Sequence, residues 1–202
     1  AHVEAHRNVL RRYWHHFFRD SDDTIVNPAR LSADRSIDVC GQCHAVQSLG
    51  SQARIRQWSN NGMPFRPGDD LARSRYIFDL RSGDPSDAFF QRTIRNNPHF
   101  AEERFWPDGV VNVSGREYQG VRDSPCYISG EFTCLTCHDM HQAREDSRAP
   151  VAWANDQLAP DAQDDAVCVG CHPRFAEPSV LEAHSHHPAN SAGSSCYNCH
   201  MP

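Results

Sequence analysis

The sequence predicts a mainly α-helical fold with extensive irregular loops and one small β-hairpin. Two features of composition indicate this: 11 glycines and 13 prolines occur among 202 residues, and the mean hydropathy is −0.68. Both residue types interrupt regular structure, so the helices should be short and the connections long. In addition, apolar residues recur at helical spacing in several segments, whereas a pattern typical of paired strands occurs in one place.

Helical spacing first occurs in residues 3–18, where apolar side chains recur every three or four positions and the polar run 20–23 follows. A second helix is expected to begin near Ser32. Asp84-Pro85 resembles an N-cap followed by proline at the first helical position, and Asn97-Pro98 should close the helix that it opens.

The expected hairpin and the last helix follow in the second half of the chain. Residues 110–113 and 116–118 flank the turn residues Ser114-Gly115, which favours a short hairpin. A capping box that begins at Ser179 predicts a helix that ends before Pro188.

One pentapeptide pattern, C-x-x-C-H, occurs four times. It places two thiols and a histidine at fixed spacing, which is the attachment signature of c-type haem. The thiols bond to the porphyrin vinyl groups, and the histidine is an axial ligand of iron. The sequence therefore predicts four covalent haem c groups, numbered here in chain order. Their attachment residues are Cys40, Cys43 and His44; Cys134, Cys137 and His138; Cys168, Cys171 and His172; and Cys196, Cys199 and His200.

Two other interpretations of these cysteines explain less. Zinc sites use paired C-x-x-C motifs but do not require a histidine directly after the second cysteine. A disulfide framework also leaves the four histidines without a role. Cys126 is the one cysteine outside the motifs, and a small buried hydrophobic residue is its simplest interpretation.

Four haems over 202 residues leave roughly 50 residues for each haem, too few to enclose each one in a protein core. The haems should therefore form much of the core, as in a haem-packed multihaem cytochrome c. We expect one tetrahaem unit over residues 1–202. Within it, residues 1–54 hold the N-terminal helix and haem 1, residues 55–125 form a connecting lobe, and residues 126–202 hold haems 2 to 4.

Nine further histidines could act as second axial ligands, so every haem could be bis-histidine ligated. His141 lies three residues after His138, so on a continuing helix it would reach a neighbouring haem rather than the same iron. His184 and His187 would share one helix face. His6 lies on the apolar face of the first expected helix. The alternatives are His2, His15, His16, His99 and His186.

Charge and hydropathy limit the partners and the location. The chain has no lysine, and its 20 basic residues against 26 acids give a net charge of −6, which disfavours a nucleic-acid partner. No apolar run approaches the length of a membrane span, so no transmembrane segment is expected in this chain. Covalent haem is attached outside the cytoplasm, so we expect a periplasmic or extracellular protein.

The chain resembles the bis-histidine multihaem cytochromes c, particularly the large ones associated with tetratricopeptide domains. The resemblance implies that each C-x-x-C-H histidine is a proximal ligand. It also implies that the later histidines of C-x-x-C-H-x-x-H and of the H-x-H-H segment serve other haems, which supports His141 and the 184–187 group. It covers the chain from about residue 32 onward and rests on residues 104–109, 115–118, 124–127, 134–141, 184–188, 194 and 196–202.

Three functions agree with these residues. The first is electron transfer through the four haems, as a relay or a subunit of a larger redox assembly whose partners are redox proteins or further copies of the chain. The second is a multihaem oxidoreductase in which one open-site haem acts on small nitrogen or sulfur species. The third is a subunit of a polymerising cytochrome filament. Because the last motif ends at His200, we also expect haem 4 at a contact surface.

Overall fold

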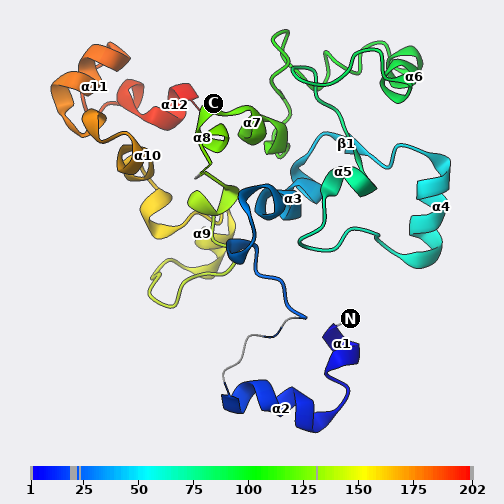
Figure 1. Ribbon diagram of the computed structural model, residues 1–202. Helices are drawn as coiled ribbons and strands as arrows, with labels where there is room; N and C mark the ends of the chain where they lie inside the picture. Colours follow the sequence, from blue (N-terminus) through cyan, green and yellow to red (C-terminus); the bar gives the residue numbers. More distant parts are fainter. Residues whose placement is uncertain (1, 19–21, 23, 131, 201–202) are drawn as a thin grey trace. The chain divides into compact units, whose positions relative to one another are not determined.

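The computed structural model describes residues 2–18, 22, 24–130 and 132–200 (Figure 1). About half of the chain is helical, one small antiparallel sheet has two strands, and loops connect the rest, which confirms the predicted fold class. The chain divides into two compact units, residues 1–131 and 132–202, and each is described by itself.

Unit 1 consists of short helices and the two strands. Its elements are α1 (His2–Ala5), α2 (Val9–Phe18), η1 (Pro28–Arg30), α3 (Ala33–His44), β1 (Gln47–Ser48), α4 (Gln52–Asn61), α5 (Leu71–Ser74), β2 (Tyr76–Ile77), α6 (Ala88–Asn96), α7 (Tyr118–Asp123) and α8 (Pro125–Ile128), where η denotes a 3₁₀ helix.

Unit 2 consists of shorter helices still. Its elements are η2 (Cys134–Thr136), α9 (Pro150–Ala154), η3 (Pro160–Ala162), α10 (Ala166–Cys171), η4 (Pro173–Ala176), α11 (Pro178–Ser185), η5 (Ala192–Ser194) and α12 (Cys196–His200).

The helix boundaries agree with the sequence at some points and differ at others. α3 starts directly after Ser32, as predicted. The expected helix over 3–18 is divided into α1 and α2. α6 ends at Asn96 with Asn97 as its C-cap, as expected, but its N-cap is Asp87, whose carboxylate accepts two backbone N–H groups of the first turn at 2.9 Å. Asp84 instead accepts from Ser86, so Pro85 lies in the preceding turn.

The two-stranded sheet lies elsewhere than predicted. β1 pairs antiparallel with β2, with Gln47 opposite Ile77 and Ser48 opposite Tyr76. The expected hairpin over 110–118 is wrong: that segment contributes one isolated bridge, between Phe105 and Val111, and Tyr118 already begins α7.

An aromatic cluster explains why the strands pair where they do. Val46, Phe78, Phe100 and Phe105 are all less than 10 % exposed and form one core, in which the Phe78 and Phe100 rings lie 4.5 Å apart. The backbone N–H of Phe78 donates to the carbonyl of Val46 at 2.9 Å. The buried amide of Gln119 donates to the carbonyls of both Val46 and Phe78. Burial of these side chains thus places β1 beside β2, across 30 residues of chain.

The first C-x-x-C-H motif forms the last turn of α3, which packs against α5 and α7 (Figure 1). Gly41 is buried at this contact. A Cβ atom there would lie 2.5 Å from Cδ2 of Tyr118 and 2.9 Å from Cδ2 of Leu71. The motif therefore needs glycine at its second position because the α7 ring occupies the space of a side chain.

We expect Gly41→Ala to lower the free energy of unfolding of the haem-loaded protein by about 1–3 kcal/mol, because the added methyl group overpacks this contact. Gly170 is the matched control: it lies inside the third motif, on helix α10, and a Cβ atom there meets nothing within 4 Å. Gly170→Ala should be neutral or slightly stabilising. Thermal melts measure both; an equal effect of the two changes would contradict the packing argument.

Unit 2 has almost no core of its own. In its described part, Cys137 and Ala162 are the buried apolar side chains, and Ser194 is the buried polar one. A segment of this length cannot stabilise itself with two small apolar side chains. We therefore expect covalently bound groups to supply the apolar core that the side chains of unit 2 lack.

Candidate functional site

The four C-x-x-C-H motifs lie on short helical turns. The first ends α3, the second begins with η2, the third covers the end of α10 and its C-cap His172, and the fourth forms α12. The histidine of each motif is exposed, as are Cys43, Cys171 and Cys199. None of the nine cysteines, all of which are described, forms a disulfide. The four imidazoles and these three thiols are thus accessible, whereas Cys137 is buried and the other motif thiols are partly exposed. Cys126, which was expected to be buried, is exposed as well.

The histidine of the first motif lies beside the residue that precedes α7. Nδ1 of His44 lies 3.4 Å from Oε2 of Glu117, the residue that precedes the helix. Arg116 donates a hydrogen bond to the carbonyl of Cys43. A carboxylate on Nδ1 is a common arrangement of metal-binding histidines, because it leaves Nε2 as the ligand atom.

The second motif shows the same arrangement with a backbone oxygen. Nδ1 of His138 lies 3.0 Å from the carbonyl oxygen of Asp156, which favours the tautomer with the proton on Nδ1. The backbone of this turn also pairs with the following segment: the N–H of Ala159 donates to the carbonyl of Cys137 at 2.9 Å. Burial raises the pKa of the Cys137 thiol.

The argument that placed His141 on a helix with His138 is wrong. η2 ends at Thr136, and the chain is irregular at His141, which is exposed. The backbone leaves the helix because the residues after Cys137 bond across to residues 156–159. As a ligand of another haem, His141 now rests on the resemblance alone.

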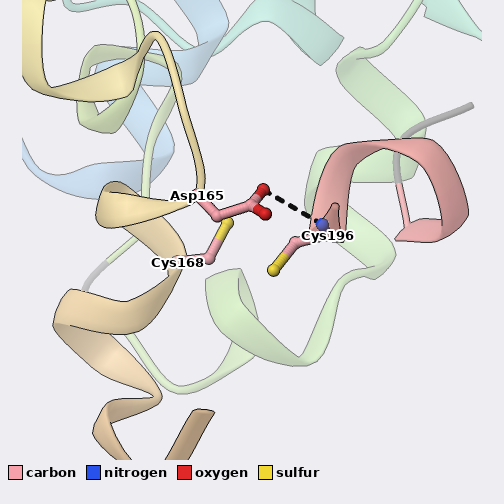
Figure 2. A group of neighbouring side chains, drawn as sticks. All are labelled: Asp165, Cys168 and Cys196. Atoms are coloured by element: carbon pink, nitrogen blue, oxygen red, sulfur yellow. Dashed lines mark hydrogen bonds between the residues drawn. The ribbon is translucent and has the colours of Figure 1, made fainter. Parts of the chain in front are cut away.

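The third and fourth motifs meet at their first cysteines (Figure 2). The ligand atoms of Asp165, Cys168 and Cys196 all lie within 4.8 Å of one another. Asp165 precedes α10, and its Oδ1 accepts the backbone N–H of Cys196 at 3.0 Å and the Ser195 hydroxyl at 3.3 Å. This carboxylate ties the start of α12 to the start of α10.

Burial is the main cause that raises the pKa of the Cys196 thiol to about 11, and the nearby Asp165 carboxylate adds to it. The group of three could also be taken for a zinc site. It offers three ligand atoms where a structural zinc site uses four, and its two sulfurs belong to two different C-x-x-C-H motifs. The donor set therefore fits two neighbouring haem attachments better than one metal ion.

The ring of His184 on α11 lies parallel to the ring of His200 in the fourth motif. The ring centroids of His184 and His200 lie 6.1 Å apart, and the ring planes differ by 2°. An imidazole nitrogen binds a first-row metal at about 2 Å, and its ring centre lies about 1 Å further away, so two rings on opposite sides of one metal have centres about 6 Å apart. The centroid distance therefore agrees with two imidazoles that share one metal, and this distance alone, since the rings are stacked, makes His184 the candidate partner of His200.

The remaining candidates of this segment are arranged differently from the prediction. α11 begins at Pro178 with Glu177 as its N-cap, so the expected capping box at Ser179 is not formed. It ends at Ser185, and His186 adopts the left-handed conformation with φ of 59°. His187 therefore lies outside the helix and does not share a helix face with His184. Its ring packs against Gly193, where a Cβ atom would come within 2.4 Å of it.

His6 lies in unit 1 and is part of a polar contact. Its Nε2 is 2.8 Å from Oδ2 of Asp22 and 3.3 Å from Oγ1 of Thr24. Among the rivals, His99 is exposed and its Nδ1 lies 3.0 Å from Glu102, which raises the pKa of the imidazole. The side chains of His2, His15 and His16 lie outside the described residues.

Comparison with known protein families agrees with the motifs. A family described as the doubled CXXCH motif matches residues 128–177, about a quarter of the chain, and this range contains the second and third motifs. The match supports a multihaem c-type cytochrome with covalently bound haem c and iron. Neither the curated proteins nor the solved structures give a match to this chain. No helix in the described ranges is both long and apolar enough to cross a membrane.

Proposed function

We propose that this chain transfers electrons through four covalently bound c-type haems, as a relay or as a subunit of a larger redox assembly. The approach of Cys168 and Cys196 within 4.8 Å carries the proposal. Each sulfur would join a different porphyrin by a thioether bond, so the edges of haems 3 and 4 would lie almost in contact. Since electron transfer rates fall steeply with distance, such a pair exchanges electrons readily.

The ligand pair at the fourth motif supports electron transfer over catalysis. With His200 on one side and His184 on the other, the iron would have no open position for a substrate. The protein would then act on the potential through ligand identity, burial and nearby charge. An oxidoreductase with an open-site haem would need one haem without such a partner.

The small core of unit 2 supports haem binding by a second route. Its three motifs lie in a segment whose described side chains bury little apolar surface. Porphyrin faces would replace the missing core, and the thioether bonds would hold the loops in place. The first motif lies on α3 of unit 1 and would attach haem 1, which brings the number of haems to four.

His141, His187 and His6 are the further proposed axial ligands, on the basis of the sequence and of the family resemblance. The same resemblance supports a relation to the cytochromes associated with tetratricopeptide domains. A periplasmic or extracellular location follows from haem attachment outside the cytoplasm. Redox proteins or further copies of the chain are the proposed partners, because the net charge of −6 disfavours nucleic acid.

Haem content and magnetic coupling test the proposal. The mature protein should carry four haems by intact mass and by haem absorbance, and its ferric electron paramagnetic resonance spectrum should show interaction between haems 3 and 4. A Cys168→Ser, Cys171→Ser variant should lose one haem and that interaction, whereas Cys40→Ser, Cys43→Ser should lose one haem and keep it. A spectrum of four independent haems would contradict the proposed pair, and a high-spin signal in the unaltered protein would favour the oxidoreductase.

A further inference from the structure

An open groove of about 790 Å³ borders the first C-x-x-C-H motif. Its volume is within the range of ligand pockets, roughly 300–1,000 Å³. One side is formed by Cys43 and by the chain that follows α3, and the Trp58 side chain contributes an aromatic surface. The charged side chains that line it are mostly basic: Arg75, Arg104 and Arg116, with Glu103 as the acid.

Arg75 differs from the other basic residues of the groove by its burial. It follows α5 as the C-cap and is 7 % exposed. Its Nη2 points to the sulfur of Met63, a weak acceptor without charge. Its Nη1 is buried and has no hydrogen-bond partner among the described residues. Burial lowers the pKa of this guanidinium below its usual value.

The other charges of the groove do not neutralise Arg75. Glu103 accepts from Arg104 at 2.7 Å and from Asn97 at 3.1 Å. Arg116 donates to the carbonyl of Cys43, which carries no charge. Among the lining residues, two positive charges thus remain without an acid, and a haem carries two propionate groups. A buried, unpaired cation is costly, so such a site fits an anionic group that completes it.

We propose that the buried guanidinium of Arg75 binds a propionate of the haem attached to Cys40 and Cys43 and thereby raises the potential of that haem. The inference rests on the proposed function, since it requires haem at the first motif. Arg75 would contact the haem at its propionate and would not touch the iron. Reduction adds negative charge to the haem, and a fixed positive charge beside it stabilises the reduced form.

The test is a spectroelectrochemical titration of the four-haem protein and of its Arg75 variants. The wave of haem 1 is identified as the one that disappears in the Cys40→Ser, Cys43→Ser variant. In Arg75→Gln, which removes the charge but keeps a polar side chain, this wave should move to a more negative potential while the other three stay in place. Arg75→Lys keeps the charge and should restore most of the shift. Arg73→Gln is the matched control, because Arg73 is exposed on α5.

The outcomes separate this inference from the proposed function. If the double cysteine variant still carries four haems, the first motif does not bind haem and the proposed function fails there. If haem 1 is present but Arg75→Gln leaves its potential unchanged, or if Arg75→Lys shifts it as far as Arg75→Gln, the inference alone is wrong. If Arg75→Gln fails to retain haem 1 while Arg75→Lys retains it, the charge is required and the inference holds; loss of haem 1 in both variants overturns it.

Discussion

Replacing His184 by alanine is expected to convert one haem from the low-spin to the high-spin ferric state, while all four haems stay attached. The physical reason is the proposed ligation of one iron by His184 and His200, whose ring centroids lie 6.1 Å apart, the separation expected of two imidazoles that share a metal. Attachment would depend on the proposed thioether bonds to Cys196 and Cys199 and not on this ligand. Electron paramagnetic resonance measures the spin states, and intact mass measures the haem content.

The neighbouring histidines provide the control for His184. His186 adopts the left-handed conformation, which asparagine tolerates, so His186→Asn should keep the backbone and leave all haems low-spin. His187→Ala tests the second candidate of the same segment. A high-spin haem in His187→Ala together with an unchanged spectrum in His184→Ala would contradict the assignment and transfer the role to His187.

Local patterns in the sequence predicted the motifs and several helix boundaries. The C-x-x-C-H spacing is chemistry within five residues, so it can be read without the fold. Ser32 before α3 and Asn97 after α6 are also local signals, because capping involves the adjacent turn of the same helix. The low hydropathy and the many glycines and prolines correctly indicated short helices.

The contacts that build the site were not predictable in this way. Asp165 meets Cys196 across 31 residues, and Arg75 lines the groove beside Cys43 through the packing of α5 on α3. Neither belongs to a motif, so their spacing carries no signal. The hairpin prediction failed for a related reason: the pattern over 110–118 matched a strand pair, but burial of Tyr118 and Gln119 against α3 and the aromatic cluster selects a helix there.

The charge of Asp38 holds α3, and with it the first motif, against α5 and α7. This carboxylate is 6 % exposed. It accepts the Tyr118 hydroxyl at 2.5 Å, the backbone N–H of Leu71 at 3.1 Å and the Arg35 guanidinium at 3.2 Å. Burial and this carboxylate both raise the pKa of Tyr118, so the phenol stays a donor at neutral pH. Replacement of Asp38 is therefore expected to cause a large loss in the free energy of unfolding.

Asp38→Ala should lower the free energy of unfolding of the haem-loaded protein by about 3 kcal/mol, because it leaves buried donors without an acceptor. Asp70 is the matched control, since it lies 3.6 Å from the same Arg35 but serves as the partly exposed N-cap of α5. Asp70→Ala should cost about 1 kcal/mol, the usual effect of a lost cap. Denaturant titration followed at the haem absorbance measures both changes. Equal losses in the two variants would show that Asp38 acts only through Arg35, because that is the partner which the two carboxylates share.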